Sequence, residues 1–251
     1  MIWDADAHIS SENGGIRIRE KTLLEQMDAN GVEKSLIWLH PGQTEDEYVD
    51  YDAQNKYIYD MGRKYPDRFH PVGWLNPKNF SSEKAIFDYA RKLHEVYGFG
   101  TVKLNGAQNY FHLIEYRPAE AAIEAIVENR MKLAFHCGND VNTHPNNVSR
   151  IAKRYPVTPI LLVHMGQTEN EAAIQAARDN SNIYLIGSGM TDYAYVRKAV
   201  DTIGSKRVLF GSDIPFGNLS EIIQTYENVL VGLNDTEKQN VFYANAEKFF
   251  L

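Results

Sequence analysis

Four short polar phrases in this sequence carry side chains suited to chemistry, and each follows an apolar run typical of a buried strand. Acidic and imidazole groups carry protons and bind divalent metals. α/β barrels and open α/β sheets place such groups at the carboxyl ends of parallel strands. The phrases are Asp4-Ala-Asp6-Ala-His8, Phe135-His136-Cys137-Gly138, Val163-His164-Met165-Gly166 and Phe210-Gly211-Ser212-Asp213.

The spacing of these residues predicts a metal centre. Successive strand residues face opposite sides, so Asp4, Asp6 and His8 share one face, and Asp6 and His8 can reach the same cation. His136 would add an imidazole and Asp213 a carboxylate from two further strands. One such residue alone is more often a turn cap or a satisfied core group, but coincidences on separate strands favour a shared role. Mixed nitrogen and oxygen ligands suit zinc, and also manganese, iron or cobalt, so we expect one divalent metal ion with zinc first among these.

The elements that must position these residues alternate regularly along the chain. Strand-like runs start about 20 to 35 residues apart, as in repeated βαβ units. The predicted strands are residues 2–8, 34–39, 69–75, 101–105, 132–136, 160–164, 183–187 and 208–211. The predicted helices are residues 20–30, 51–65, 82–96, 119–129, 147–155, 168–178, 192–203 and 220–233, followed by a terminal helix from 236 to about 250.

This alternation predicts an α/β protein with a (β/α)8 TIM barrel, folded as a single domain over residues 1–251 with a C-terminal helix. An open doubly wound sheet is the alternative. The Gly-rich phosphate turn expected after the first strand of such a sheet is absent from the sequence. The barrel is therefore the favoured architecture.

Composition limits the partners and the compartment. Hydrophobic residues make up 43% of the 251, charged residues 24%, and the formal net charge is -7. A negative total argues against nucleic acid or an anionic membrane surface as a partner, since both attract positive proteins. No apolar run approaches the roughly 18 residues of a membrane span, and no basic leader precedes the first strand. The single cysteine, Cys137, excludes intrachain disulfides and fits a reducing cytoplasm, so we expect a cytoplasmic protein.

The sequence also resembles a known family. Several phrases occur in the order that the amidohydrolase superfamily shows, in the amidohydrolase-2 branch that contains aminocarboxymuconate semialdehyde decarboxylase and related hydrolases. The resemblance extends over nearly the whole chain. Its phrases are Lys64-Tyr-Pro-Asp-Arg-Phe69, Gly100-Thr-Val-Lys-Leu104, Leu133-Ala-Phe-His-Cys-Gly138, Leu162-Val-His-Met-Gly166, Val208-Leu-Phe-Gly-Ser-Asp-Ile-Pro215 and Asn245-Ala-Glu-Lys-Phe249.

The resemblance implies roles for individual residues. By it, His136 and Asp213 are metal ligands, and His164 is the histidine that handles protons. The first strand departs from the pattern, because the family commonly has His-x-His where this chain has Asp6-Ala7-His8. Asp6 would then be a further ligand that favours oxygen-preferring metals, or a neighbour that orients His8.

Two reactions fit this set of groups. A divalent metal lowers the pKa of its bound water from 15.7 toward about 7 and polarises carbonyl oxygens. With Asp213 and His164 as proton carriers, the site would hydrolyse a C–N or C–O bond of an amide, lactone or ester in a small carboxylate-bearing molecule. The alternative is non-oxidative decarboxylation of an unsaturated or aromatic acid, in which the same groups protonate carbon. Hydrolysis is favoured because the short chain leaves little room for long substrate-covering loops. A second alternative is an inactive barrel with a binding role.

Three further residues are candidates for substrate binding. Lys103 shares a face of the strand predicted at 101–105 with Thr101 and Asn105. It could bind an anionic group, bridge a second metal as a carbamate, or be a helix-facing or rim lysine without a role. His40 could line the barrel mouth or cap a loop. Trp74 lies near the carboxyl end of its predicted strand and is the tryptophan considered for the pocket. The expected partner is a small-molecule substrate, and the sequence leaves a homodimer open.

Overall fold

Parallel strands form the centre of the fold. The computed structural model describes residues 1–12, 14–42, 49–138 and 140–251. Within these residues the strands fall into two hydrogen-bonded sets, β1-β2-β3 and β4-β5-β6-β7-β8-β9, and every paired neighbour runs parallel. The strands are β1 (Trp3–Ile9), β2 (Lys34–Leu39), β3 (Phe69–Pro71), β4 (Gly73–Trp74), β5 (Thr101–Leu104), β6 (Lys132–His136), β7 (Ile160–Val163), β8 (Ile183–Ile186) and β9 (Val208–Leu209).

Backbone hydrogen bonds join the two sets into a closed barrel. At one junction β3 and β4 are consecutive pieces of the single strand predicted at 69–75, and between them the N–H of Val72 donates to the carbonyl of Ile37 at 3.1 Å. At the other junction β1 meets the segment after β9, where the N–H of His8 donates to the carbonyl of Ile214 at 2.7 Å. The predicted (β/α)8 TIM barrel is confirmed, with its third strand split in two.

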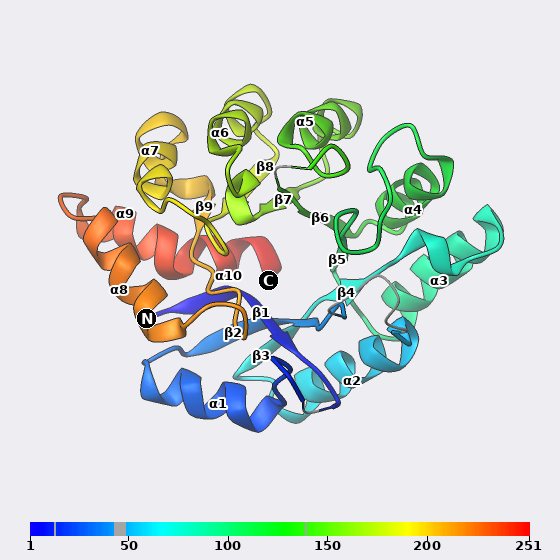
Figure 1. Cartoon of the computed structure of the whole chain (residues 1–251), viewed down its shortest axis with the longest axis horizontal. Helices are drawn as coiled ribbons and strands as arrows, with labels where there is room; N and C mark the ends of the chain where they lie inside the picture. Colours follow the sequence, from blue (N-terminus) through cyan, green and yellow to red (C-terminus); the bar gives the residue numbers. More distant parts are fainter. Residues whose placement is uncertain (13, 43–48, 139) are drawn as a thin grey trace.

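Helices surround the strands in chain order, and Figure 1 shows α1 to α8 as a ring around them. The ring helices are α1 (Glu20–Ala29), α2 (Tyr51–Lys64), α3 (Glu83–Glu95), α4 (Arg117–Glu128), α5 (Pro145–Arg154), α6 (Asn170–Asp179), α7 (Ala194–Ile203) and α8 (Leu219–Val229). Short 3₁₀ turns lie at η1 (Pro77–Asn79), η2 (His164–Gly166) and η3 (Ser205–Arg207). Polar side chains cap several starts, as where Ser82 accepts from the N–H of Ala85 at 3.2 Å. No helix among the described residues is both long and apolar enough to cross a membrane.

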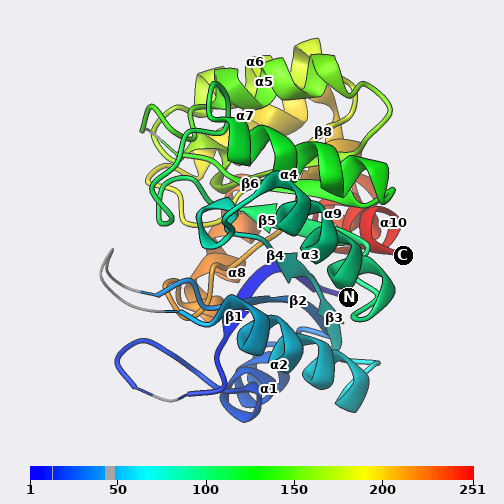
Figure 2. The same cartoon turned by 90° about the vertical axis from the view of Figure 1, so that its right-hand side faces the viewer.

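The C-terminal segment covers one end of the barrel. It consists of α9 (Asp235–Gln239), the π-helical η4 (Asn240–Ala244) and α10 (Asn245–Phe250), which together replace the continuous helix expected from 236. Phe249 packs edge-on against Tyr184, and Phe250 contacts the ring of His70. Figure 2 shows both termini at this end, with the loops that follow the strands at the opposite end. The loop-bearing end is therefore the one available for chemistry.

Candidate metal centre and active site

The first strand brings Asp6 and His8 to the centre of the barrel mouth. A register shift between Asp4 and Ala7 interrupts the alternation that would have placed three polar side chains on one face. Asp6 is fully buried and His8 is 3% exposed. Asp4 turns to the segment after β9, where its carboxylate accepts hydrogen bonds from the N–H of Ser212 at 2.9 Å and its hydroxyl at 2.6 Å. Asp4 therefore stabilises the backbone around the site through hydrogen bonds, whereas Asp6 and His8 face the centre of the site.

The orientation of His8 defines what it can bind. Its Nδ1 lies 2.7 Å from the carbonyl oxygen of Leu39. Because a carbonyl only accepts, Nδ1 carries the hydrogen and Nε2 presents a lone pair. Nε2 lies 3.7 Å from Oδ1 of Asp6 and 3.6 Å from Oδ1 of Asp213, too far for hydrogen bonds. Burial, reinforced by the charge of Lys103, lowers the pKa of His8 to about 3, so the imidazole is neutral.

His164 and Asp213 are aimed into the site by unusual backbone conformations. Their φ angles are 66° and 57°, in the left-handed region that side chains with a Cβ seldom adopt. His164 Nδ1 lies 3.1 Å from both the carbonyl oxygen and the hydroxyl of Ser188, which leaves Nε2 as its free nitrogen. The N–H of Asp213 donates to the carbonyl of Asp6 at 2.8 Å. Backbone conformation thus sets the direction of both side chains, and Ser188 also holds the ring of His164.

His136 completes the imidazole cluster. It ends β6, beside β7, and its ring packs edge-on against His164 with centroids 4.6 Å apart. Burial lowers its pKa well below the ordinary value, with the neighbouring His164 and Lys103 adding to the effect. Burial also lowers the pKa of His164 to about 4, because the nearby carboxylate of Asp6 offsets only part of it. All three imidazoles are neutral at neutral pH, the form that binds metal.

The two carboxyl groups of the site differ in their electrostatics. Burial opposes the charge on Asp6, but Lys103, His164 and His8 outweigh it, and the pKa of Asp6 is held below its usual value. Burial and the adjacent charge of Asp6 raise the pKa of Asp213 well above its usual value. One carboxylate is therefore a fixed negative charge, and the other group holds its proton more tightly.

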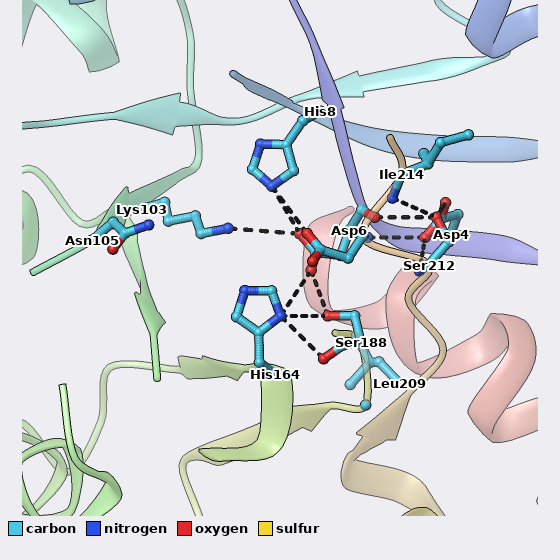
Figure 3. A network of polar contacts seen from close by, with 12 residues as sticks. Asp4, Asp6, His8, Lys103, Asn105, His164, Ser188, Leu209, Ser212 and Ile214 are labelled. Atoms are coloured by element: carbon cyan, nitrogen blue, oxygen red, sulfur yellow. Dashed lines mark hydrogen bonds and ion pairs between the residues drawn. The ribbon is translucent and has the colours of Figure 1, made fainter. Parts of the chain in front are cut away.

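Lys103 lies inside the site and is not a rim residue. Its side chain is 1% exposed, and Nζ lies 3.6 Å from Oδ1 of Asp6 (Figure 3). Nζ also lies 4.7 Å and 5.2 Å from the ring centroids of Trp38 and Trp74. Indole faces and a carboxylate attract a cation and repel an anion. The surroundings therefore suit the ammonium form and not a negatively charged carbamate.

The other two predicted substrate residues border this centre. Trp74 is fully buried, packs edge-on against His8, and donates its indole N–H to Asn109 at 3.1 Å. His40 is 3% exposed and stacks on Phe216, which itself packs edge-on against His8. Within the described residues neither ring nitrogen of His40 has a hydrogen-bond partner, so its predicted capping alternative is not what the structure shows.

Sequence reasoning missed the residues that hold this group together. Ser188 donates a hydrogen bond to Oδ2 of Asp6 and also contacts His164, so it ties β1 to the segment after β7 (Figure 3). Gly189, at φ 57°, leaves open the space where a Cβ would lie 2.8 Å from Oδ2 of Asp213 and 2.9 Å from Nδ1 of His164. Their only signal in the sequence is a Gly-Ser-Gly phrase that begins at the last residue of the strand predicted at 183–187.

The residues fit a divalent metal ion. Ligand atoms of Asp6, His164 and Asp213 all lie within 4.8 Å of one another. Oδ1 of Asp6 is buried and has no hydrogen-bond partner among the described residues, although it faces Nε2 of His8. A lone pair and carboxylate oxygens that face each other in a buried site repel unless a cation lies between them. The structure thus brings Asp6, His8 and Asp213 together and places His136 beside His164. It also puts His164, predicted only as a proton carrier, among the atoms within reach of a cation.

Comparison with known proteins identifies the family. A family model described as amidohydrolase matches residues 5–251, so the chain belongs to the amidohydrolase family. A gamma-resorcylate decarboxylase from a Polaromonas species is 26% identical over 122 residues. That match covers 41% of this chain and only 37% of the relative.

Solved structures of similar shape support the fold. A 5-carboxyvanillate decarboxylase from Novosphingobium aromaticivorans, with bound manganese, has a TM-score of 0.77 at 17% identity and matches 100% of this chain and 97% of its own. A 2,6-dihydroxybenzoate decarboxylase from Rhizobium has a TM-score of 0.77 at 16% identity, with 99% and 98% covered. At these identities the likeness shows the barrel fold.

Proposed function

We propose that this member of the amidohydrolase family is a metal-dependent, non-oxidative decarboxylase of a small unsaturated or aromatic acid. The observation that carries the proposal is the bare Nε2 of His8, which faces carboxylate oxygens of both Asp6 and Asp213 inside a buried site. A divalent cation bound between these atoms would remove the repulsion between the lone pair and the carboxylate oxygens. The decarboxylases among the similar proteins favour the alternative over the hydrolysis expected from the sequence.

Four side chains would hold the metal: Asp6, His8, His136 and Asp213. Manganese is the metal named with the 5-carboxyvanillate decarboxylase, and a site with two carboxyl groups suits it, so we place it before the zinc expected from the sequence. When bound, the metal supplies a Lewis acid that binds oxygen atoms of the substrate and polarises them. The remaining chemistry is a proton transfer, which this chain's own groups perform.

In the proposed reaction Lys103 attracts the substrate carboxylate and His164 delivers the proton. The bond between the substrate carbon and its carboxylate breaks, carbon dioxide leaves, and the electron pair stays on carbon. A proton that His164 takes from solvent at Nε2 then joins that carbon, so one proton is consumed per turnover. Ser188 contacts Nδ1 of His164 and leaves Nε2 available for the proton transfer.

The test uses carboxylates labelled with carbon-13. The manganese-loaded protein is incubated in D₂O with 2,6-dihydroxybenzoate, 5-carboxyvanillate and their methyl esters. We expect labelled carbon dioxide from an acid and deuterium at the vacated carbon. Methanol release from an ester without carbon dioxide would establish hydrolysis instead. Metal binding without turnover of any compound would support the inactive barrel.

A further inference from the structure

Lys103 occupies the position of a counter-cation at the proposed metal site. Its Nζ lies 3.6 Å from Oδ1 of Asp6, beyond hydrogen-bond distance, so the two groups form an ion pair without a hydrogen bond. The rings of Trp38 and Trp74 cover the ammonium at 4.7 Å and 5.2 Å. A buried lysine needs such compensation, and here one carboxylate oxygen and two indole faces supply it.

The same carboxylate oxygen is the one turned toward His8. Oδ1 of Asp6 lies 3.7 Å from Nε2 of His8 and has no hydrogen-bond partner within the part of the chain that is described. The other oxygen of this carboxylate, Oδ2, already accepts a hydrogen bond from the hydroxyl of Ser188. A metal ion bound through Asp6 and His8 would therefore use the oxygen that Lys103 neutralises, and would lie close to the ammonium.

A divalent ion bound at this site would be repelled by the ammonium of Lys103. Lys103 balances Asp6 before any ligand binds. A divalent ion brings two further positive charges beside that ammonium, where little solvent screens the repulsion. A carboxylate placed between the ammonium and the metal would be attracted by both. Its arrival offsets the repulsion and makes each cation easier to accommodate.

From this juxtaposition we propose that Lys103 weakens metal binding in the absence of substrate and makes the metal and a carboxylate ligand bind cooperatively. The inference rests on the proposed metal site and adds a coupling residue to it. Because thermodynamic coupling is reciprocal, the carboxylate tightens metal binding by the same factor by which the metal tightens carboxylate binding.

The test measures manganese affinity by isothermal titration calorimetry on the metal-free full chain, with and without saturating benzoate as the carboxylate probe. In the unaltered protein, benzoate should lower the Kd for manganese by about 10-fold. In Lys103→Met, manganese alone should bind about 10-fold more tightly than in the unaltered protein, because the competing ammonium is gone. The benzoate effect in this variant should shrink to less than about 3-fold.

A matched control is Lys132→Met, which removes a lysine at the start of the neighbouring strand β6, where its ammonium contacts the carbonyl of Phe249 at the opposite end of the barrel. Its manganese Kd should equal that of the unaltered protein. Equal or weaker manganese binding by Lys103→Met, or no effect of benzoate on the unaltered protein, would overturn the inference.

The benzoate titration needs no variant, so the inference stays testable if Lys103→Met does not fold. Failure of the unaltered protein to bind manganese at all would instead refute the metal site itself. The two proposals therefore fail in distinguishable ways.

Discussion

At the scale of single residues, Gly189 keeps the centre of the site open. A Cβ there would lie within 2.9 Å of both Asp213 and His164, and the φ of 57° disfavours a side chain. We predict that Gly189→Ala displaces one of these groups and lowers kcat about 100-fold, as expected when a reacting group moves by about 1 Å. Steady-state kinetics of the metal-loaded protein measures this.

The control for that change is Gly98→Ala. Gly98 has a φ of 66°, and nothing within 4 Å would meet its Cβ. Both variants should lose about 1 kcal/mol of stability through backbone strain, but only Gly189→Ala should lose activity. Normal kcat in Gly189→Ala would show that the space beside Asp213 and His164 has no role in the reaction.

The paired histidines His136 and His164 should respond differently to substitution. We predict that His136→Ala sharply lowers metal content, whereas His164→Asn retains the metal and loses kcat by about 10²–10⁴-fold, the usual contribution of a positioned acid or base. Metal analysis and kinetics on the same preparations separate the two roles. Metal loss in His164→Asn would make it a ligand, which its place beside Asp6 and Asp213 also permits.

The reactive residues could be predicted from the sequence because acidic and imidazole side chains that follow apolar runs form a recognisable pattern. Asp6 and His8 lie on β1 and Asp213 lies in the segment after β9, and all three meet in the structure. Ser188 and Gly189 could not be found this way, because a hydroxyl and a missing side chain are common in turns. Their partners are distant in sequence, with Ser188 and Asp6 separated by 182 residues, and only the closed barrel brings them together.

At the scale of elements, Asp4 fastens β1 to the segment that carries Asp213. Its carboxylate accepts from the N–H and hydroxyl of Ser212 and from the N–H of Asp6 at 3.1 Å. We predict that Asp4→Ala lowers the free energy of unfolding by about 3 kcal/mol, because buried donors lose their acceptor. Asp4→Asn keeps an oxygen for the two N–H groups and should cost less than about 1 kcal/mol.

Urea unfolding of both variants gives the stability difference, and manganese titration shows whether the hydrogen bonds of Asp4 support the metal site. We expect Asp4→Ala to bind manganese more weakly and Asp4→Asn to restore most of the affinity. Equal losses of affinity in the two variants would show that the charge of Asp4, and not its hydrogen bonds, matters.

Element boundaries differed from prediction where tertiary contacts overrode local patterns. The strand predicted at 69–75 is split because Val72 bonds to β2 while Trp74 pairs with Lys103 of β5. The strand predicted at 208–211 ends as β9 at Leu209, since the N–H of Phe210 donates to the carbonyl of Val241 in η4. Both interruptions depend on partners that a local apolar pattern does not reveal.

At the scale of the whole molecule, buried histidines make stability depend on pH. Burial lowers the pKa of His8 to about 3 and those of His40, His70 and His164 to about 4, and holds that of His136 well below normal. A group with a depressed folded-state pKa contributes stability above its unfolded pKa, here about 6.5, and loses it as the pH falls toward the folded value.

Two carboxyl groups oppose this trend. Burial raises the pKa of Asp4 to about 7 and that of Asp213 well above normal, so their contribution is present below about 3.8 and is lost as the pH rises. The stability that the five histidines lose as the pH falls is larger than the stability that the two carboxyl groups gain. We therefore predict that the metal-free protein loses stability between pH 6.5 and 4, measured as a falling urea midpoint. His70→Phe, far from the proposed metal, should flatten the slope, and a midpoint that is constant over this range would contradict the burial of neutral imidazoles.

The central claim is that Asp6, His8, His136 and Asp213 together hold a divalent metal at the barrel mouth. Anomalous scattering at the manganese edge, from crystals soaked in manganese, tests it most directly. The account predicts one strong peak within about 2.3 Å of Oδ1 of Asp6 and Nε2 of His8, with His136 and Asp213 in its coordination shell. No peak at the mouth, or a peak bound only to surface carboxylates, would contradict the claim.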